Sequence, residues 1–117
     1  MKQIGIKLKF LLAENPKYLL YIEHLGCDPL NKVIFVDGRI FLVTGALKQL
    51  FIRLNQDGLF QINKGKIINL CHIQSVDNKH VILKNGSKHL VSRRKLEPLL
   101  CKIKSKSENI LSFQELG

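Results

Sequence analysis

Apolar and polar residues alternate at the start of the chain, in the pattern of a half-buried strand. Over residues 4–12 every second residue is apolar, with lysines among the residues between. Residues 18–23, rich in aromatic and branched side chains, predict a second strand. Residues 32–36 and 39–43 are short apolar stretches on either side of Asp37-Gly38, a dipeptide that favours a two-residue hairpin turn. The first third of the chain is therefore predicted to be antiparallel β structure.

The spacing of the apolar residues then changes from every second position to the spacing of a helix. Within residues 47–54 the apolar side chains fall at i, i+3, i+4 and i+7, which places them on one stripe. We expect Thr44 to cap this helix, and residues 55–58, with their Asn, Asp and Gly, to end it.

Short strands follow in close succession, which predicts an antiparallel meander. The expected strands cover residues 59–62, 66–70, 73–76, 80–84 and 88–91, with Asn85-Gly86 as a second tight turn. A second helical stripe comes from Leu96, Leu99, Leu100 and Ile103. Pro98 within it requires the helix to begin no earlier than about residue 94 or 95.

These elements predict a mostly β fold, made of small antiparallel sheets with two short helices. Residues 1–104 are expected to form one domain, and residues 105–117 a polar C-terminal tail. There is no helix-turn-helix pattern. If the domain reads DNA, loops between strands must therefore enter the grooves.

The charge of the chain points to a polyanionic partner. Nineteen basic and nine acidic residues give a formal charge of +10, and eleven of the basic residues lie in residues 64–106 with only two acidic ones. Such a concentration is the electrostatic footprint of a polyanion binder. A basic surface that only maintains solubility would give the same count. An acidic membrane surface is a weaker alternative, because most of this charge falls in short strands and loops instead of an amphipathic helix.

The remaining composition narrows the class of protein. The N-terminus has lysines where a signal peptide needs an unbroken apolar run, so we expect a cytoplasmic location. Cys27, Cys71 and Cys101 have no C-x-x-C spacing, which suits a reducing compartment. The four histidines show no metal-binding or catalytic spacing, and no nucleophile–base set, phosphate loop or carboxylate pair is recognisable. We therefore expect no enzyme activity, cofactor, metal or small-molecule substrate.

Four short motifs occur in the order found in one family of DNA-binding domains. They are Tyr21-Ile22-Glu23, Gly45-Ala46-Leu47-Lys48-Gln49-Leu50, the segment from Phe60 through Ile67-Ile68-Asn69 to Ile73, and Val91-Ser92-Arg93-Arg94. Each motif alone is weak, but four in the correct order make a specific match. The chain resembles the LytTR (LytR/AlgR-type) family over essentially its whole length, without a receiver domain in front.

The resemblance implies a bacterial transcription regulator that binds double-stranded promoter DNA. Members of this family place loops into two successive major grooves and touch the minor groove between them. They commonly occupy paired direct repeats, one domain per repeat, which leaves open whether a homodimer forms on DNA. Some members without a receiver domain are held in check by a small membrane protein, so a membrane or signalling protein is a further partner that the resemblance suggests.

The first two loops that the resemblance implicates differ from the family pattern. Residues 28–32 lack the His or Arg that often reaches a base edge and offer Asn31, which can pair with adenine, and Lys32, which suits a phosphate. The second loop has Asn63, Lys64, Gly65 and Lys66 in place of the usual His-Arg-Ser-Tyr. Lysine keeps the charge of arginine without its planar fork, so we expect phosphate affinity with altered selectivity from this loop.

The third loop, Ser92-Arg93-Arg94-Lys95, agrees with the family. Arg93 is the first choice for a base contact, because arginine pairing with guanine is the commonest specific contact. Arg94 and Lys95 are expected to bind phosphates, and Ser92 to bind a phosphate or cap the helix. Three cations at a helix start oppose the helix dipole, a conflict that a bound polyanion would relieve.

Two alternative functions remain open at this point. One is an RNA-binding β module, which usually displays aromatic residues among basic ones on a sheet face, whereas here only Phe60 lies near the basic half. The other is a protein-interaction domain with an exposed strand edge and an incidental basic surface. A binding affinity that falls steeply as the salt concentration rises would favour the DNA-binding function. Cys27, close to the first loop, is also a candidate redox switch.

Overall fold

The computed structural model describes residues 15–26, 30–54 and 58–116, and the strand expected over residues 4–12 lies outside them. The elements are η1 (Pro16–Tyr18), β1 (Leu19–His24), β2 (Leu30–Phe35), β3 (Ile40–Thr44), α2 (Leu47–Leu54), β4 (Leu59–Asn63), β5 (Lys66–Asn69), η2 (Leu70–His72), β6 (Ile73–Val76), β7 (His80–Leu83), β8 (Lys88–Leu90) and α3 (Arg93–Leu116). The expected mostly β fold with two helices is confirmed, and the described residues contain no helix-turn-helix.

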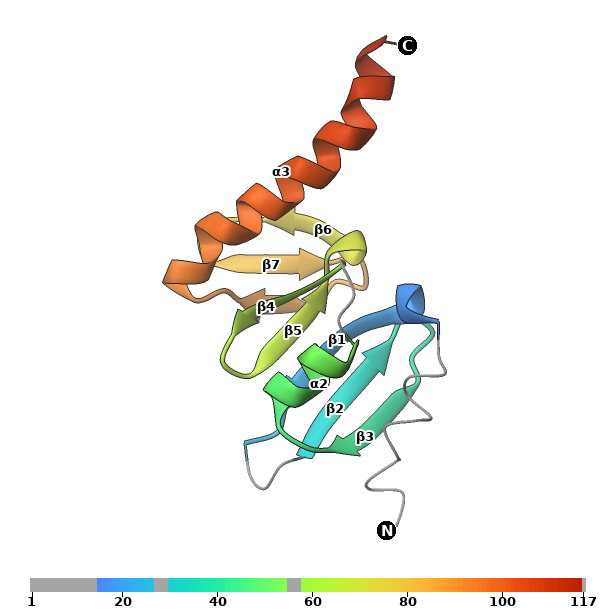
Figure 1. Cartoon of the computed structure of the whole chain (residues 1–117), viewed down its shortest axis with the longest axis vertical. Helices are drawn as coiled ribbons and strands as arrows, with labels where there is room; N and C mark the ends of the chain where they lie inside the picture. Colours follow the sequence, from blue (N-terminus) through green and yellow to red (C-terminus); the bar gives the residue numbers. More distant parts are fainter. Residues whose placement is uncertain (1–14, 27–29, 55–57, 117) are drawn as a thin grey trace.

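A five-stranded antiparallel sheet with the order β3-β2-β1-β5-β4 forms the centre of the molecule (Figure 1). Its central strand β1 pairs with β2 on one side and β5 on the other, so that Ile22 lies opposite both Val33 and Ile67. All three side chains are fully buried. Because β1 and β5 are far apart in sequence, the sheet depends on a non-local pairing that the hairpin signals do not reveal.

The expected meander is divided between two sheets. β4 and β5 join the five-stranded sheet, whereas β6, β7 and β8 form a separate three-stranded sheet. The chain leaves the first sheet at Asn69, whose side-chain oxygen accepts a hydrogen bond from the N–H of Cys71 at the start of η2. The Asn69 amide nitrogen donates to the carbonyl of Leu19 at 2.7 Å. This buried asparagine thus stabilises the bend at which the chain changes sheets.

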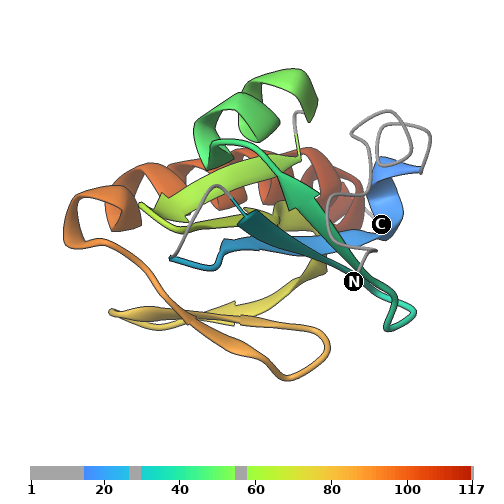
Figure 2. The same cartoon turned by 90° about the horizontal axis from the view of Figure 1, so that it is seen from below.

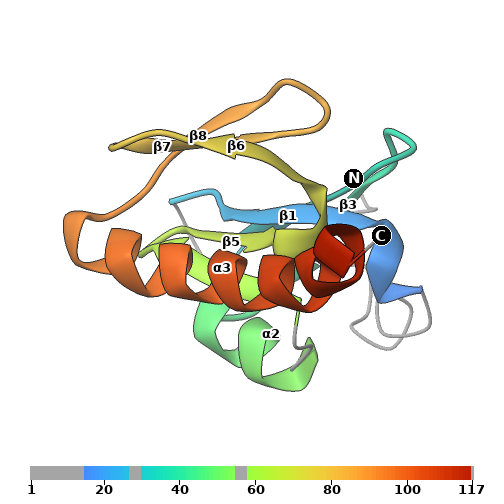
Figure 3. The same ribbon diagram turned by 90° about the horizontal axis from the view of Figure 1, so that it is seen from above.

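Two apolar cores lie on opposite faces of the five-stranded sheet (Figures 2 and 3). Helix α2 covers one face, where Leu47, Leu50 and Leu54 pack against the sheet. The three-stranded sheet covers the other face, and α3 runs beside the edge strand β4 with Leu99 fully buried. The stripe that predicted α2 is therefore the surface by which this helix packs. In the second stripe Leu96, Leu99 and Ile103 pack against the core, whereas Leu100 is exposed.

Both predicted hairpin turns are present. Gly38 and Gly86 have φ of 94° and 90°, a region that glycine enters without steric cost. In each turn the preceding Asp37 or Asn85 accepts a hydrogen bond from a backbone N–H two residues later. These turns follow from the local sequence because the required backbone conformation and the side-chain acceptor are adjacent in the chain.

The helix boundaries differ from those expected. Thr44 is the last residue of β3, and the cap position of α2 is Ala46, whose carbonyl accepts from the N–H of Leu50. Helix α3 begins at Arg93, slightly earlier than expected, and contains Pro98. It spans 24 residues and continues through the predicted tail, projecting beyond the sheets (Figure 1). α3 is thus much longer than the short second helix expected.

Candidate nucleic-acid interface

Three segments meet at one edge of the molecule, where β1 ends, β4 turns into β5 and α3 begins. The N–H of His24, the last residue of β1, donates to the carbonyl of Gly65 in the β4–β5 turn at 2.8 Å. The N–H of Ser92, which precedes α3, donates to the carbonyl of Ile62 in β4 at 2.9 Å. Figures 1 and 3 show these segments on the same side of the molecule. The fold therefore brings together the second and third predicted loops and the end of β1, and we call this region the loop edge.

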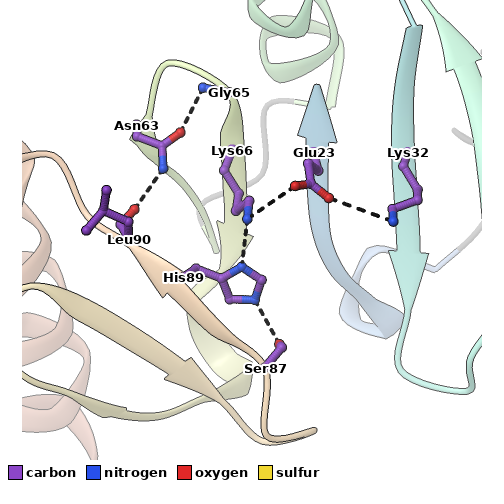
Figure 4. Close-up of polar contacts among 8 residues, drawn as sticks. All are labelled: Glu23, Lys32, Asn63, Gly65, Lys66, Ser87, His89 and Leu90. Carbon is purple, nitrogen blue, oxygen red and sulfur yellow. Dashed lines mark hydrogen bonds and ion pairs between the residues drawn. The ribbon is translucent and has the colours of Figure 1, made fainter. Parts of the chain in front are cut away.

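Asn63 holds the β4–β5 turn to the segment before α3 (Figure 4). Its amide nitrogen donates to the carbonyl of Leu90 at 2.7 Å, and its oxygen accepts from the N–H of Gly65 at 2.8 Å. Both ends of the amide are thus occupied by backbone groups. Asn63 thus positions the turn. The exposed cationic side chain of the turn is that of Lys64.

Lys66 and Lys32 share one carboxylate. The ammonium of Lys66 lies 3.5 Å from Oε2 of Glu23, and that of Lys32 lies 3.8 Å from Oε1 (Figure 4). Only 17% of the Lys66 side chain is exposed, whereas 34% of Lys32 is. Glu23 balances one of these two positive charges, so this pair contributes less to the field at the loop edge than its sequence suggests.

His89 links the two sheets through Lys66. The Lys66 ammonium can only donate, so Nδ1 of His89, 3.0 Å away, accepts, and the ring proton is on Nε2, which donates to Ser87 Oγ at 2.8 Å. Burial, together with the positive charge of Lys66, lowers the pKa of His89 to about 4. The His89 ring packs against Tyr21, whose pKa is raised by burial and by Glu23. His89 is thus a neutral part of the scaffold.

The exposed positive charge of the loop edge lies at the β4–β5 turn and at the start of α3. Lys64, Arg93 and Arg94 are exposed, and Ser92 and Lys95 are half-buried. Among the described residues, no acidic side chain forms an ion pair with any of these four cations. The first turn of α3 also contains no acidic residue, so its cations face the positive end of the helix dipole. An anion placed here would be attracted both by these cations and by the positive end of the helix dipole.

Asn31 is not a candidate base contact, contrary to the sequence-based expectation. Its side chain is fully buried, and its amide nitrogen donates to the carbonyls of Val43 and Gly45 at 3.2 and 2.6 Å. Its oxygen lies 3.0 Å from Nδ1 of His24. Asn31 therefore ties β2 to the connection between β3 and α2, and every polar atom of its side chain is used within the fold.

Sequence reasoning did not single out His24, because the predicted second strand ended at residue 23. The structure places His24 at the end of β1, half-buried and next to the β4–β5 turn. A Cβ added to Gly65 would lie 3.9 Å from the Cβ of His24. The only sequence signal was the position of His24 immediately after Tyr-Ile-Glu, because its pairing with the turn depends on strands distant in sequence.

Other predicted chemistry falls away from the loop edge or outside the described residues. Cys27, the candidate redox switch, and the neighbouring residues 28 and 29 lie outside them. Cys71 and Cys101 are exposed free thiols. No cluster of three or more His, Cys, Asp or Glu within the described ranges could hold a metal ion. No described helix is both long and apolar enough to cross a membrane.

Comparisons with known proteins agree with this architecture. The family model described as the LytTr DNA-binding domain matches residues 14–104. Among solved structures, the LytTr DNA-binding domain of a methyl-accepting/DNA response regulator from Bacillus cereus is similar, with a TM-score of 0.60. That match has 18% sequence identity and covers 72% of this chain and 82% of the other, which shows a common fold. No curated protein matches the sequence.

Proposed function

The chain belongs to the LytTr DNA-binding domain family, a family of DNA-binding domains and not of enzymes, and on this premise we propose that it is a bacterial transcription regulator. In this proposal it binds duplex promoter DNA sequence-specifically by inserting the loop edge into the grooves. The observation that carries the proposal is the convergence of the β4–β5 turn and the start of α3 through the Asn63–Leu90 hydrogen bond. That contact gathers the exposed cations of two distant segments on one surface.

The cations of the loop edge divide into two roles. Arg93 reads a base edge, because its planar guanidinium can contact guanine O6 and N7 together. Lys64, Arg94 and Lys95 bind phosphates, which fixes the register of the protein on the duplex. Ser92 adds a hydroxyl that can donate a hydrogen bond to a phosphate oxygen.

Lys32 and Lys66 act at the margin of this surface. Because both ammonium groups approach Glu23, its carboxylate offsets part of the positive potential that they present to a phosphate. Asn63 contributes by positioning the turn, and Asn31 by supporting β2 from within. The binding surface is therefore narrower than the nine residues named from the sequence.

Two copies of the domain, each on one of two direct repeats, fit the family to which the chain belongs. In this arrangement the same loop edge faces each half-site in the same orientation, and the two copies need not touch. A cytoplasmic location and control by a separate membrane or signalling protein complete the proposal. The basic character of residues 64–106 supports a nucleic-acid partner over a chance surface charge.

Selection of random duplex DNA on the purified protein tests this function. We expect enrichment of two similar half-sites in direct repeat, and an affinity that falls steeply with salt, with a logarithmic slope of about −0.9 for each phosphate contacted. A parallel selection with RNA tests the RNA-binding alternative. Absence of any enriched duplex, with weak binding at low salt, would refute the proposal and favour a protein partner.

A further inference from the structure

The imidazole of His24 is held in one orientation by a buried asparagine. Because the amide nitrogen of Asn31 donates to two carbonyls, its oxygen must face His24. That oxygen can only accept, so Nδ1 of His24 carries a proton and donates to it over 3.0 Å. Val43, which supplies one of the two carbonyls, is the buried residue of the edge strand β3, and Gly45, which supplies the other, follows that strand. The ring is thus anchored through one nitrogen to the interior of the fold.

The other ring nitrogen of His24 is accessible to solvent. Within the described part of the chain, Nε2 has no hydrogen-bond partner, and no side-chain nitrogen or oxygen is both buried and unpartnered. Nε2 is therefore accessible to solvent, and the backbone and Cβ of His24 lie beside Gly65 of the β4–β5 turn. With Nδ1 protonated, Nε2 of the neutral ring is a hydrogen-bond acceptor.

A hydrogen-bond acceptor is unusual among the side chains of the loop edge. Lys64, Arg93, Arg94 and Lys95 can only donate hydrogen bonds, so they suit phosphates and guanine. In the major groove the exocyclic amino groups of cytosine (N4) and adenine (N6) are the donors, and only an acceptor can read them. The carboxylate of Glu23, on the same strand, is occupied by two lysines.

We propose that His24 is a specificity-determining residue that accepts, through Nε2, a hydrogen bond from the exocyclic amino group of a cytosine or adenine in the major groove. The inference rests on the proposed function, because it requires the loop edge to enter DNA. Asn31 acts as a positioning residue, since its buried amide fixes the direction of the Nε2 lone pair. The end of β1, which precedes the first predicted loop, thus reads a base through His24, and Asn31 makes no base contact.

Removal of single amino groups from the DNA tests the inference. In the duplex selected by the wild-type protein, each cytosine is replaced in turn by 2-pyrimidinone and each adenine by purine, and affinity is measured at pH 8. We expect a loss of roughly three- to tenfold at one position of each half-site. The identity of the sensitive base tells whether cytosine or adenine supplies the amino group. A flat series for the wild-type protein would overturn the inference.

Two variants assign the effect to His24. His24→Asn keeps an amide donor near the position of Nδ1 and lacks Nε2, so it should show no loss at the sensitive position. His24→Gln places an amide oxygen near the position of Nε2 and should retain at least part of the loss. If His24→Asn proves unfolded, the wild-type series and His24→Gln still decide. A series for a folded His24→Asn identical to that of the wild type overturns the inference.

Different experimental outcomes refute the proposed function and this inference. A wild-type protein that selects no duplex site removes both. A selected site that depends on Arg93 and is insensitive to His24 and to every amino group leaves the function intact and overturns the inference alone.

Discussion

The side-chain amide of Asn63 donates to the carbonyl of Leu90 at 2.7 Å and joins the β4–β5 turn to the segment before α3. Asn63→Ala removes this bond and the one to Gly65, so we expect the free energy of unfolding to fall by about 1–2 kcal/mol. Specific DNA affinity should fall with it, because the two loops lose their common register. Urea denaturation and DNA titration measure both effects.

The matched control for Asn63→Ala is Lys64→Ala in the same turn. Lys64 is exposed, so its loss should change the free energy of unfolding by less than about 0.5 kcal/mol while it weakens DNA binding. Equal stability of Asn63→Ala and Lys64→Ala would contradict the bridging role of Asn63.

Asn31→Ala tests whether this residue belongs to the scaffold. The substitution leaves the carbonyls of Val43 and Gly45 and the imidazole of His24 without their partner, so we expect a loss of roughly 2–3 kcal/mol in the free energy of unfolding. Asn85→Ala, at an exposed hairpin turn, is the comparison and should cost less. Denaturation curves in urea measure the difference. A fully stable Asn31→Ala would mean that its hydrogen bonds contribute nothing to folding.

His89 makes the stability of the domain depend on pH. Its pKa is about 4 in the folded chain and near 6.5 when unfolded, so the unfolded chain binds the proton more readily. The stability that the neutral ring of His89 contributes is fully present above pH 6.5 and is lost as the pH falls towards 4. We expect this fall in pH to lower the free energy of unfolding by as much as about 3 kcal/mol.

His89→Asn isolates this contribution from that of the carboxylates. Asparagine keeps an acceptor for Lys66 and cannot titrate, so the variant should show a flatter dependence of stability between pH 6.5 and pH 4. Denaturant titrations at several pH values give the two profiles. Profiles of identical slope would exclude His89 as the source.

Glu23→Gln tests the charge balance at the edge of the proposed surface. The change releases Lys32 and Lys66 from their shared carboxylate, so affinity for random duplex at low salt should rise a few-fold. Because both ion pairs are partly exposed, the free energy of unfolding should change by less than about 1 kcal/mol. Fluorescence anisotropy with random DNA measures the gain. An unchanged affinity would place both lysines away from the duplex.

Arg93 and Arg94 provide a pair of adjacent variants with different expected effects. Arg93→Ala should cost about 1–3 kcal/mol on the selected site and far less on random DNA, because it removes a base contact. Arg94→Ala should weaken both equally and reduce the salt slope by about 1. Titrations on both DNAs at several salt concentrations give these values. Equal losses for Arg93→Ala on both DNAs would make it a backbone contact.

The local sequence was sufficient for most elements of this fold. Asp37-Gly38 and Asn85-Gly86 each carry the turn conformation and its side-chain acceptor within a few residues, and the stripe over residues 47–54 carries the buried face of α2. The order of the family motifs, which reflects the order of the elements, was likewise readable from the chain. Thr44 was placed wrongly because a cap depends on where the preceding strand ends.

The candidate site was only partly readable from the sequence. Lys64, Arg93 and Arg94 were named from charge and motif, and the structure leaves them exposed. Asn31 was interpreted wrongly, and His24 was not singled out, because burial and hydrogen-bond partners are properties of the packed chain. A polar residue in an expected loop gives no sign that it lies in a strand with its amide bound to β3 and Gly45.

The sequence by itself determined the strands, the turns, the apolar helix faces and the concentration of positive charge, because these depend on neighbouring residues. Only the tertiary structure decided which strands share a sheet and which polar side chains face solvent. The pairing of β1 with β5 and the contact of Asn63 with Leu90 join residues far apart in the chain. Such contacts form when the apolar faces pack together, and no local pattern specifies the partner.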